Sequence, residues 1–181
     1  MQKRNYNEIF VHVSVCTHKE PKEILIISDN PQGLLDEIQK YKNINTTTIA
    51  TDMENIRNLQ DNSYDIVLCE AEVNDVTVAH VNRALKEDAL ASFNGFNLLE
   101  VEASKAKLQA VTKYFKIAMP FSLLSHQKAL LASKEYHPTA DINLQRADLT
   151  DGYEVYNSDL HVALFAMPTY IKKTYLGYIR N

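Results

Sequence analysis

The chain has 181 residues, of which 45% are hydrophobic, so it can bury one substantial core and we expect one domain over residues 1–181. Its 19 basic and 23 acidic residues give a net charge of −4 and no strongly basic stretch, which argues against nucleic-acid binding. No segment approaches the roughly 20 apolar residues of a membrane span. These features predict a cytoplasmic protein that binds neither nucleic acid nor membrane.

The two cysteines, Cys16 and Cys69, lie far apart and have no Cys or His neighbour at metal-ligand spacing. The sequence therefore predicts no metal site and a reducing environment. Cys69 lies in an apolar run, which favours a buried and inert thiol over a nucleophile.

We expect a lead-in helix over residues 1–20 and the sheet core over residues 21–181. Residues 23–28 (EILIIS) form an unbroken apolar run, which is typical of a parallel strand covered on both faces. Pro31 and Gly33 then open a segment whose apolar residues recur on one helical face. The order is strand, turn, helix.

The same alternation continues along the chain. Strands are predicted at residues 46–50, 65–69 and 89–93, helices at 54–59, 75–85 and 98–111, two further strands at 114–119 and 129–132, and final helices at 157–164 and 168–175. This order predicts an α/β, Rossmann-like fold with a mostly parallel sheet, an antiparallel end and helices on both faces. Ligands of such sheets bind beyond the carboxyl ends of the strands, so the loops after Ser28, Ala50, Cys69 and Phe93 are the candidate site.

Residues 156–168 (YNSDLHVALFAMP) resemble the Tyr-Asn-x-Asp-x-His-x-x-x-Phe-x-x-Pro signature of spermidine and spermine synthases. The opening tyrosine of that signature borders the polyamine site, which implies this role for Tyr156. Val162 departs from the family, which usually has a basic residue there. Taken without the family, Tyr156 and Asp159 would cap and pack the helix that they begin.

A second match lies at the amino end, where Tyr6, Glu8 and His12 are followed by residues 17–23 (THKEPKE). The resemblance implies that Tyr6 and His12 flank the ligands; the alternative is the face of an amphipathic helix. Residues 118–121 (AMPF) are similar to ε-proteobacterial members. The resemblance covers nearly the whole chain but starts close to the end of the family's small β-domain, so we expect that domain to be absent.

The family carries a glycine-rich loop after its first strand, because glycine lets backbone amides approach the nucleoside. Here the loop is residues 28–33 (SDNPQG), with one glycine and a proline that removes a donor. The resemblance assigns the nucleoside contacts of this loop to Asp29 and Gly33. An alignment without gaps implies that Asp52 contacts adenine and that the ribose carboxylate is missing. A second alignment puts Asp52 at the end of the second strand, and a helix cap is the plain alternative.

Residues 70–75 (EAEVND) correspond to the family's catalytic Asp-Ser-Ser-Asp-like loop. The attacking amine is an ammonium at neutral pH and must lose a proton, which requires a carboxylate. The resemblance implies that Glu70 is the base and that Glu72 or Asp75 holds the distal amine. Solvated loop residues are the alternative.

The resemblance implies an aminopropyltransferase that uses decarboxylated S-adenosylmethionine as co-substrate and putrescine as acceptor, with no further cofactor, and that forms a homodimer. It also implies a sheet of the S-adenosylmethionine-dependent methyltransferase type with a reduced strand count. A second hypothesis is a noncatalytic relative that binds a polyamine or nucleoside, or pairs with a true synthase. A methyltransferase is the third, against which residues 156–161 (YNSDLH) argue.

Overall fold

The computed structural model describes residues 2–181, with side chains described from Asn5 onward. The helices are α1 (Gln2–Thr17), α2 (Gln32–Ile38), α3 (Met53–Arg57), α4 (Asp75–Ala84), α5 (Val101–Thr112), α6 (Leu144–Leu149), α7 (Ser158–Leu164) and α8 (Thr169–Thr174). The strands are β1 (Glu23–Ile27), β2 (Asn45–Ile49), β3 (Tyr64–Cys69), β4 (Leu85–Phe96), β5 (Ile117–Ser122) and β6 (Lys128–Ser133).

The strands form one sheet with the order β2-β1-β3-β4-β6-β5. The first four strands in this order are parallel to one another, while β6 is antiparallel to both β4 and β5. The predicted α/β class, with a mostly parallel sheet and an antiparallel end, is confirmed. Among residues 2–181, no helix combines the length and apolar content that crossing a bilayer requires.

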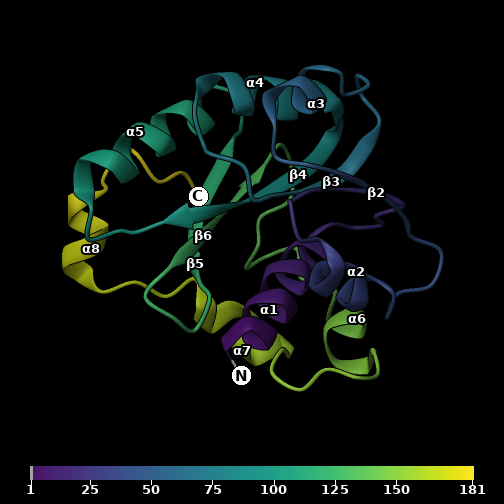
Figure 1. The fold of residues 1–181 in the computed structure, drawn as a ribbon. Coiled ribbons are helices and arrows are strands. Elements are labelled where there is room, and N and C mark those ends of the chain that lie inside the picture. Colours follow the sequence, from purple (N-terminus) through teal and green to yellow (C-terminus); the bar gives the residue numbers. More distant parts are fainter. Residues whose placement is uncertain (1) are drawn as a thin grey trace.

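The side chains of β1 explain why its sequence is an unbroken apolar run. Leu25 and Ile27 point into one core cluster and Ile24 and Ile26 into the other, and all four are fully buried. The helices α3, α4, α5 and α8 cover the first face of the sheet, and α1, α2, α6 and α7 cover the second (Figure 1).

Asp65 ties together the starts of three parallel strands. One of its carboxylate oxygens accepts the backbone amides of Lys22 and Glu23 at 2.9 and 2.8 Å, and the other binds the Lys86 ammonium at 2.8 Å. Burial opposes ionisation of Asp65, but these donors outweigh it and lower the pKa of the carboxyl group. The carboxylate thus helps to set the register of β1, β3 and β4.

One local expectation was wrong, and one short helix was not predicted. The strand predicted at residues 114–119 begins only at Ile117, because the amides of Tyr114 and Phe115 both bond to the Val111 carbonyl and continue the turn after α5. The short helix α6 was not predicted. Its amino end is capped by the Asn143 side chain, a signal present in the sequence, but only Ala147 is buried, so there is no apolar periodicity.

Candidate functional site

The carboxyl ends of the parallel strands meet in register at one edge of the sheet. Ile27 of β1 lies opposite Ile49 of β2 and Cys69 of β3, and Cys69 lies opposite Phe93 of β4. The loops that follow these residues are therefore neighbours, as the sequence predicted. Hydrogen bonds across the loops confirm this, since the amide of Glu70 donates to the Ile27 carbonyl at 2.9 Å.

Glu70 is the centre of a small polar cluster at this edge. The Tyr6 hydroxyl donates to its Oε1 at 2.5 Å, and the Ser28 hydroxyl donates to its Oε2. Burial, followed by the hydrogen bond to Glu70, raises the pKa of Tyr6 well above its usual range, so the phenol stays a donor. We call these three residues the Glu70 cluster. It unites two of the predicted site residues, Tyr6 and Glu70, with Ser28, for which no role was predicted.

A hollow of about 420 Å³ adjoins the cluster through Tyr6. It is lined by Asn5 and Tyr6 of α1 and by the loop 123–127 between β5 and β6. Leu124 in this loop is 49% exposed and has a positive φ of 53°, a backbone conformation that is unfavourable for leucine. The hollow thus combines an aromatic ring, an exposed aliphatic side chain and polar groups.

Asp29 and Asp52 follow β1 and β2, and both are exposed. The Asp29 carboxylate accepts the backbone amide of Thr51 at 2.9 Å and its hydroxyl at 2.7 Å, and these two bonds lower the pKa of Asp29. Asp52 caps α3 by accepting the amide of Asn55 at 3.0 Å. Because β2 is the second strand and pairs directly with β1, the sheet supports the alignment that puts Asp52 after the second strand.

Gly33 lies in α2 and packs against α1. A Cβ atom at this position would lie 2.0 Å from the Asn7 Nδ2 atom and 2.8 Å from its Cγ. The Asn7 side chain therefore occupies the space that a Cβ atom would need, and it must shift to accommodate any other residue here. The predicted contact of Gly33 with a nucleoside competes with this packing role.

His12 is fully buried, and its side-chain hydrogen bonds go to residues outside the Glu70 cluster. Its Nε2 donates to the Glu37 carboxylate at 2.8 Å, so in the neutral ring Nδ1 accepts the Tyr41 hydroxyl at 2.5 Å. Burial lowers the pKa of His12. The structure thus joins His12 to Glu37 and Tyr41, partners that a linear pattern could not reveal.

Tyr156 is also buried, and its polar groups bind within the protein. Its hydroxyl lies 2.5 Å from Nδ1 of His161, whose Nε2 donates to the Pro138 carbonyl at 2.8 Å, so the tyrosine is the donor to Nδ1. Its amide, with those of Glu154 and Val155, donates to one oxygen of Glu8 at 2.7–2.8 Å. Among the contacts described from Asn5 onward, none joins Tyr156 to Glu70.

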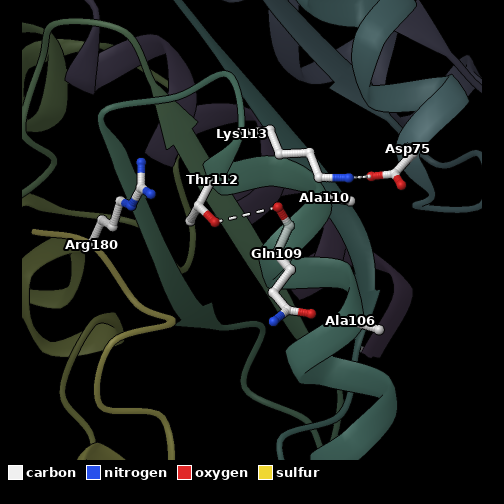
Figure 2. Close-up of a pocket in the computed structure, with 7 residues that line it drawn as sticks. All are labelled: Asp75, Ala106, Gln109, Ala110, Thr112, Lys113 and Arg180. Carbon is white, nitrogen blue, oxygen red and sulfur yellow. Dashed lines mark hydrogen bonds and ion pairs between the residues drawn. The ribbon is translucent and has the colours of Figure 1, made fainter.

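The remaining predicted residues, Glu72 and Asp75, are exposed. Asp75 pairs with Lys113 at 2.7 Å across a hollow of about 580 Å³ that Arg180 also lines (Figure 2). Exposed ion pairs of this kind contribute little to stability. Cys69 is fully buried, and burial raises the pKa of its thiol to about 12, which agrees with an inert role.

Ser28 is the residue that sequence reasoning missed. It occupies the start of a loop whose predicted nucleoside contacts are Asp29 and Gly33, so its hydroxyl had no predicted role. The available signal was a polar side chain directly after a buried strand, at the same sheet edge as Glu70.

Comparison with known proteins agrees with this architecture. Residues 3–71 match the spermine/spermidine synthase domain. A polyamine aminopropyltransferase of Helicobacter pylori (strain G27) is 25% identical over 204 residues, which cover 97% of this chain and 78% of the relative. One of Clostridium botulinum (strain Alaska E43 / Type E3) is 22% identical over 216 residues, covering 92% of this chain and 76% of the relative.

Solved structures show the same fold. The spermidine synthase from Thermotoga maritima superposes with a TM-score of 0.84 and 21% identity, over 98% of this chain and 76% of that one. A Haemonchus contortus phosphoethanolamine N-methyltransferase gives a TM-score of 0.54 at 12% identity, over 78% of this chain and 40% of that one. The predicted methyltransferase-type sheet is confirmed, and so is the predicted resemblance to the spermine/spermidine synthase family.

Proposed function

We propose that this protein transfers the aminopropyl group of decarboxylated S-adenosylmethionine to a primary amine such as putrescine, with Glu70 as general base. The observation that carries the proposal is the Glu70 cluster, a half-buried carboxylate beyond the end of β3 beside a hollow lined by Tyr6. The carboxyl ends of parallel strands are where ligands of this fold bind. The spermine/spermidine synthase domain that residues 3–71 match suggests the reaction class, and the position of the carboxylate suggests its role.

In the proposed reaction the acceptor enters the hollow as an ammonium and gives one proton to Glu70. The freed nitrogen lone pair attacks the methylene carbon next to the sulfonium, so a C–N bond forms as the C–S bond breaks. The sulfur keeps the electron pair of the broken bond and leaves as the thioether of methylthioadenosine. A correctly placed carboxylate typically accelerates such a step by about 10²–10⁴-fold.

On the nucleoside side, Asp52 is the candidate for the ribose hydroxyls, because it follows the second strand. Asp29 and Gly33 stay candidates for contacts with the nucleoside, and Glu72 or Asp75 for the distal amine. Asp29 and Asp52 are exposed, so a ligand can exchange with their present hydrogen bonds at small cost. His12 and Tyr156 are buried and bind other residues of the protein, so this proposal gives them a structural role.

A second candidate function is a noncatalytic relative that binds an amine. It is favoured by the loop 28–33, in which Pro31 lacks an amide hydrogen and Gly33 is packed against Asn7. The proline reduces the number of backbone donors in the loop, and the Asn7 side chain reduces the space beside Gly33.

Titration calorimetry with decarboxylated S-adenosylmethionine and methylthioadenosine, followed by a putrescine assay, separates the two. The transferase predicts nucleoside binding, turnover, and a loss of about 10²-fold or more in Glu70→Gln. Glu102→Gln, an exposed glutamate on α5, is the matched control and keeps full activity. Amine binding without nucleoside binding at millimolar ligand supports the second candidate and ends the first.

A further inference from the structure

Ser28 has a conformation that leaves its hydroxyl little freedom. The residue is 3% exposed, and its amide donates to the Ile49 carbonyl of β2 at 3.0 Å. Its hydroxyl oxygen accepts the amide of Asn30 at 3.0 Å, while its single hydrogen goes to Oε2 of Glu70. The hydroxyl is therefore held by its own loop and aimed at the carboxylate.

The other oxygen of Glu70 is held from a different element. Tyr6 donates to Oε1 from α1, and its ring is stacked on Phe10 with centroids 5.3 Å apart. With the Glu70 amide bonded to Ile27, both the backbone and the carboxylate of Glu70 are fixed. Each carboxylate oxygen can accept a further hydrogen bond, so the group can still receive an ammonium proton.

We propose that Ser28 is a positioning residue, whose hydroxyl fixes the orientation in which Glu70 meets a primary ammonium. The inference rests on the proposed role of Glu70. A reacting group must be held within about 0.5 Å of its productive position. A carboxylate that accepts a hydrogen bond at each oxygen is held more firmly than one that accepts a bond at a single oxygen. A glycine at residue 28 would leave Tyr6 as the remaining side-chain donor among the contacts described here.

The test is a double-mutant cycle between Ser28 and Glu70, read as putrescine affinity by titration calorimetry. Ser28→Ala is expected to weaken putrescine binding about 10-fold, and Ser28→Thr, which keeps a hydroxyl, to restore it. In a Glu70→Gln background, Ser28→Ala should change the affinity less than about 2-fold, because the group that it positions is gone. Ser28→Gly serves if the alanine variant does not fold.

Ser104→Ala is the matched control, since this buried serine donates to the Asn97 carbonyl at 2.7 Å and does not contact Glu70. Equal losses from Ser28→Ala in both backgrounds, or no loss in either, overturn the proposal. Absence of putrescine binding to the unmodified protein overturns it too. If putrescine binds but is not aminopropylated, the proposed function fails while the cycle still decides the role of Ser28.

Discussion

Replacing Gly33 by alanine tests whether this glycine is kept for helix packing. The new Cβ atom would lie 2.0 Å from Nδ2 of Asn7, whereas ordinary contacts begin near 3.4 Å, so Asn7 must move by about 1.4 Å. Overpacking of this kind costs about 1–3 kcal/mol. Alanine recovers up to about 1 kcal/mol of helix propensity in α2. We therefore expect the free energy of unfolding to fall by about 1 kcal/mol.

The same substitution in an Asn7→Ala background should have the opposite sign. With the obstructing side chain removed, only the gain in helix propensity is left, and Gly33→Ala should stabilise the protein by about 0.5–1 kcal/mol. Urea unfolding of the four proteins measures both effects. Equal destabilisation in both backgrounds would show that Asn7 is not the cause and would refute the packing argument.

Methylthioadenosine affinity of the stable double variant then tests the other role of Gly33. Normal affinity means that the methyl group is tolerated and that the glycine serves packing alone. Lost affinity in a protein of normal stability means that Gly33 also approaches the nucleoside, as the family resemblance implied.

Two further predictions concern the attachment of the carboxyl-terminal segment. Glu8 is 1% exposed and accepts three consecutive backbone amides, so Glu8→Ala should lower the free energy of unfolding by about 3 kcal/mol. Glu8→Gln keeps a carbonyl acceptor and should lower it by about 1–2 kcal/mol. Losses below about 0.5 kcal/mol in urea unfolding would contradict this. Burial lowers the pKa of His161 to about 4, so between pH 6.5 and pH 4 the unfolded chain binds a proton that the folded chain excludes. Stability from this neutral histidine is fully present above pH 6.5 and falls by about 3 kcal/mol towards pH 4. His161→Gln should reduce that slope, and an unchanged slope would contradict the assignment.

The sheet could be predicted because its strands are signalled locally. An apolar run such as that of β1 can only be buried on both faces, and the alternation with helices then implies a parallel sheet. The position of β2 was less certain, since its sequence NTTTI has one apolar residue and lies at the sheet edge. Direct pairing with β1 supports the alignment that puts Asp52 after the second strand.

The sequence indicated which candidate residues are neighbours only where the sheet itself determines contacts. Glu70 and Tyr6 meet because β3 and α1 bring them to the same edge. The surroundings of His12 and Tyr156 depend on side chains more than 25 residues away, such as Tyr41 and Glu8, and no periodicity reports those distances. Both residues are buried because each has an internal partner for its polar atoms.

The two halves of the candidate site differ in the space beside their polar groups. On the nucleoside side, Asp29 binds Thr51, Asp52 caps α3 and Gly33 packs against Asn7. On the amine side, both oxygens of Glu70 keep a free acceptor position and a hollow adjoins Tyr6. Asp29 and Asp52 accept one hydrogen bond at each carboxylate oxygen, as Glu70 does, so a ligand can add to either side, but Asn7 occupies the space beside Gly33. The nucleoside titration is therefore the measurement that distinguishes a transferase from an amine-binding relative, since amine binding is expected of both.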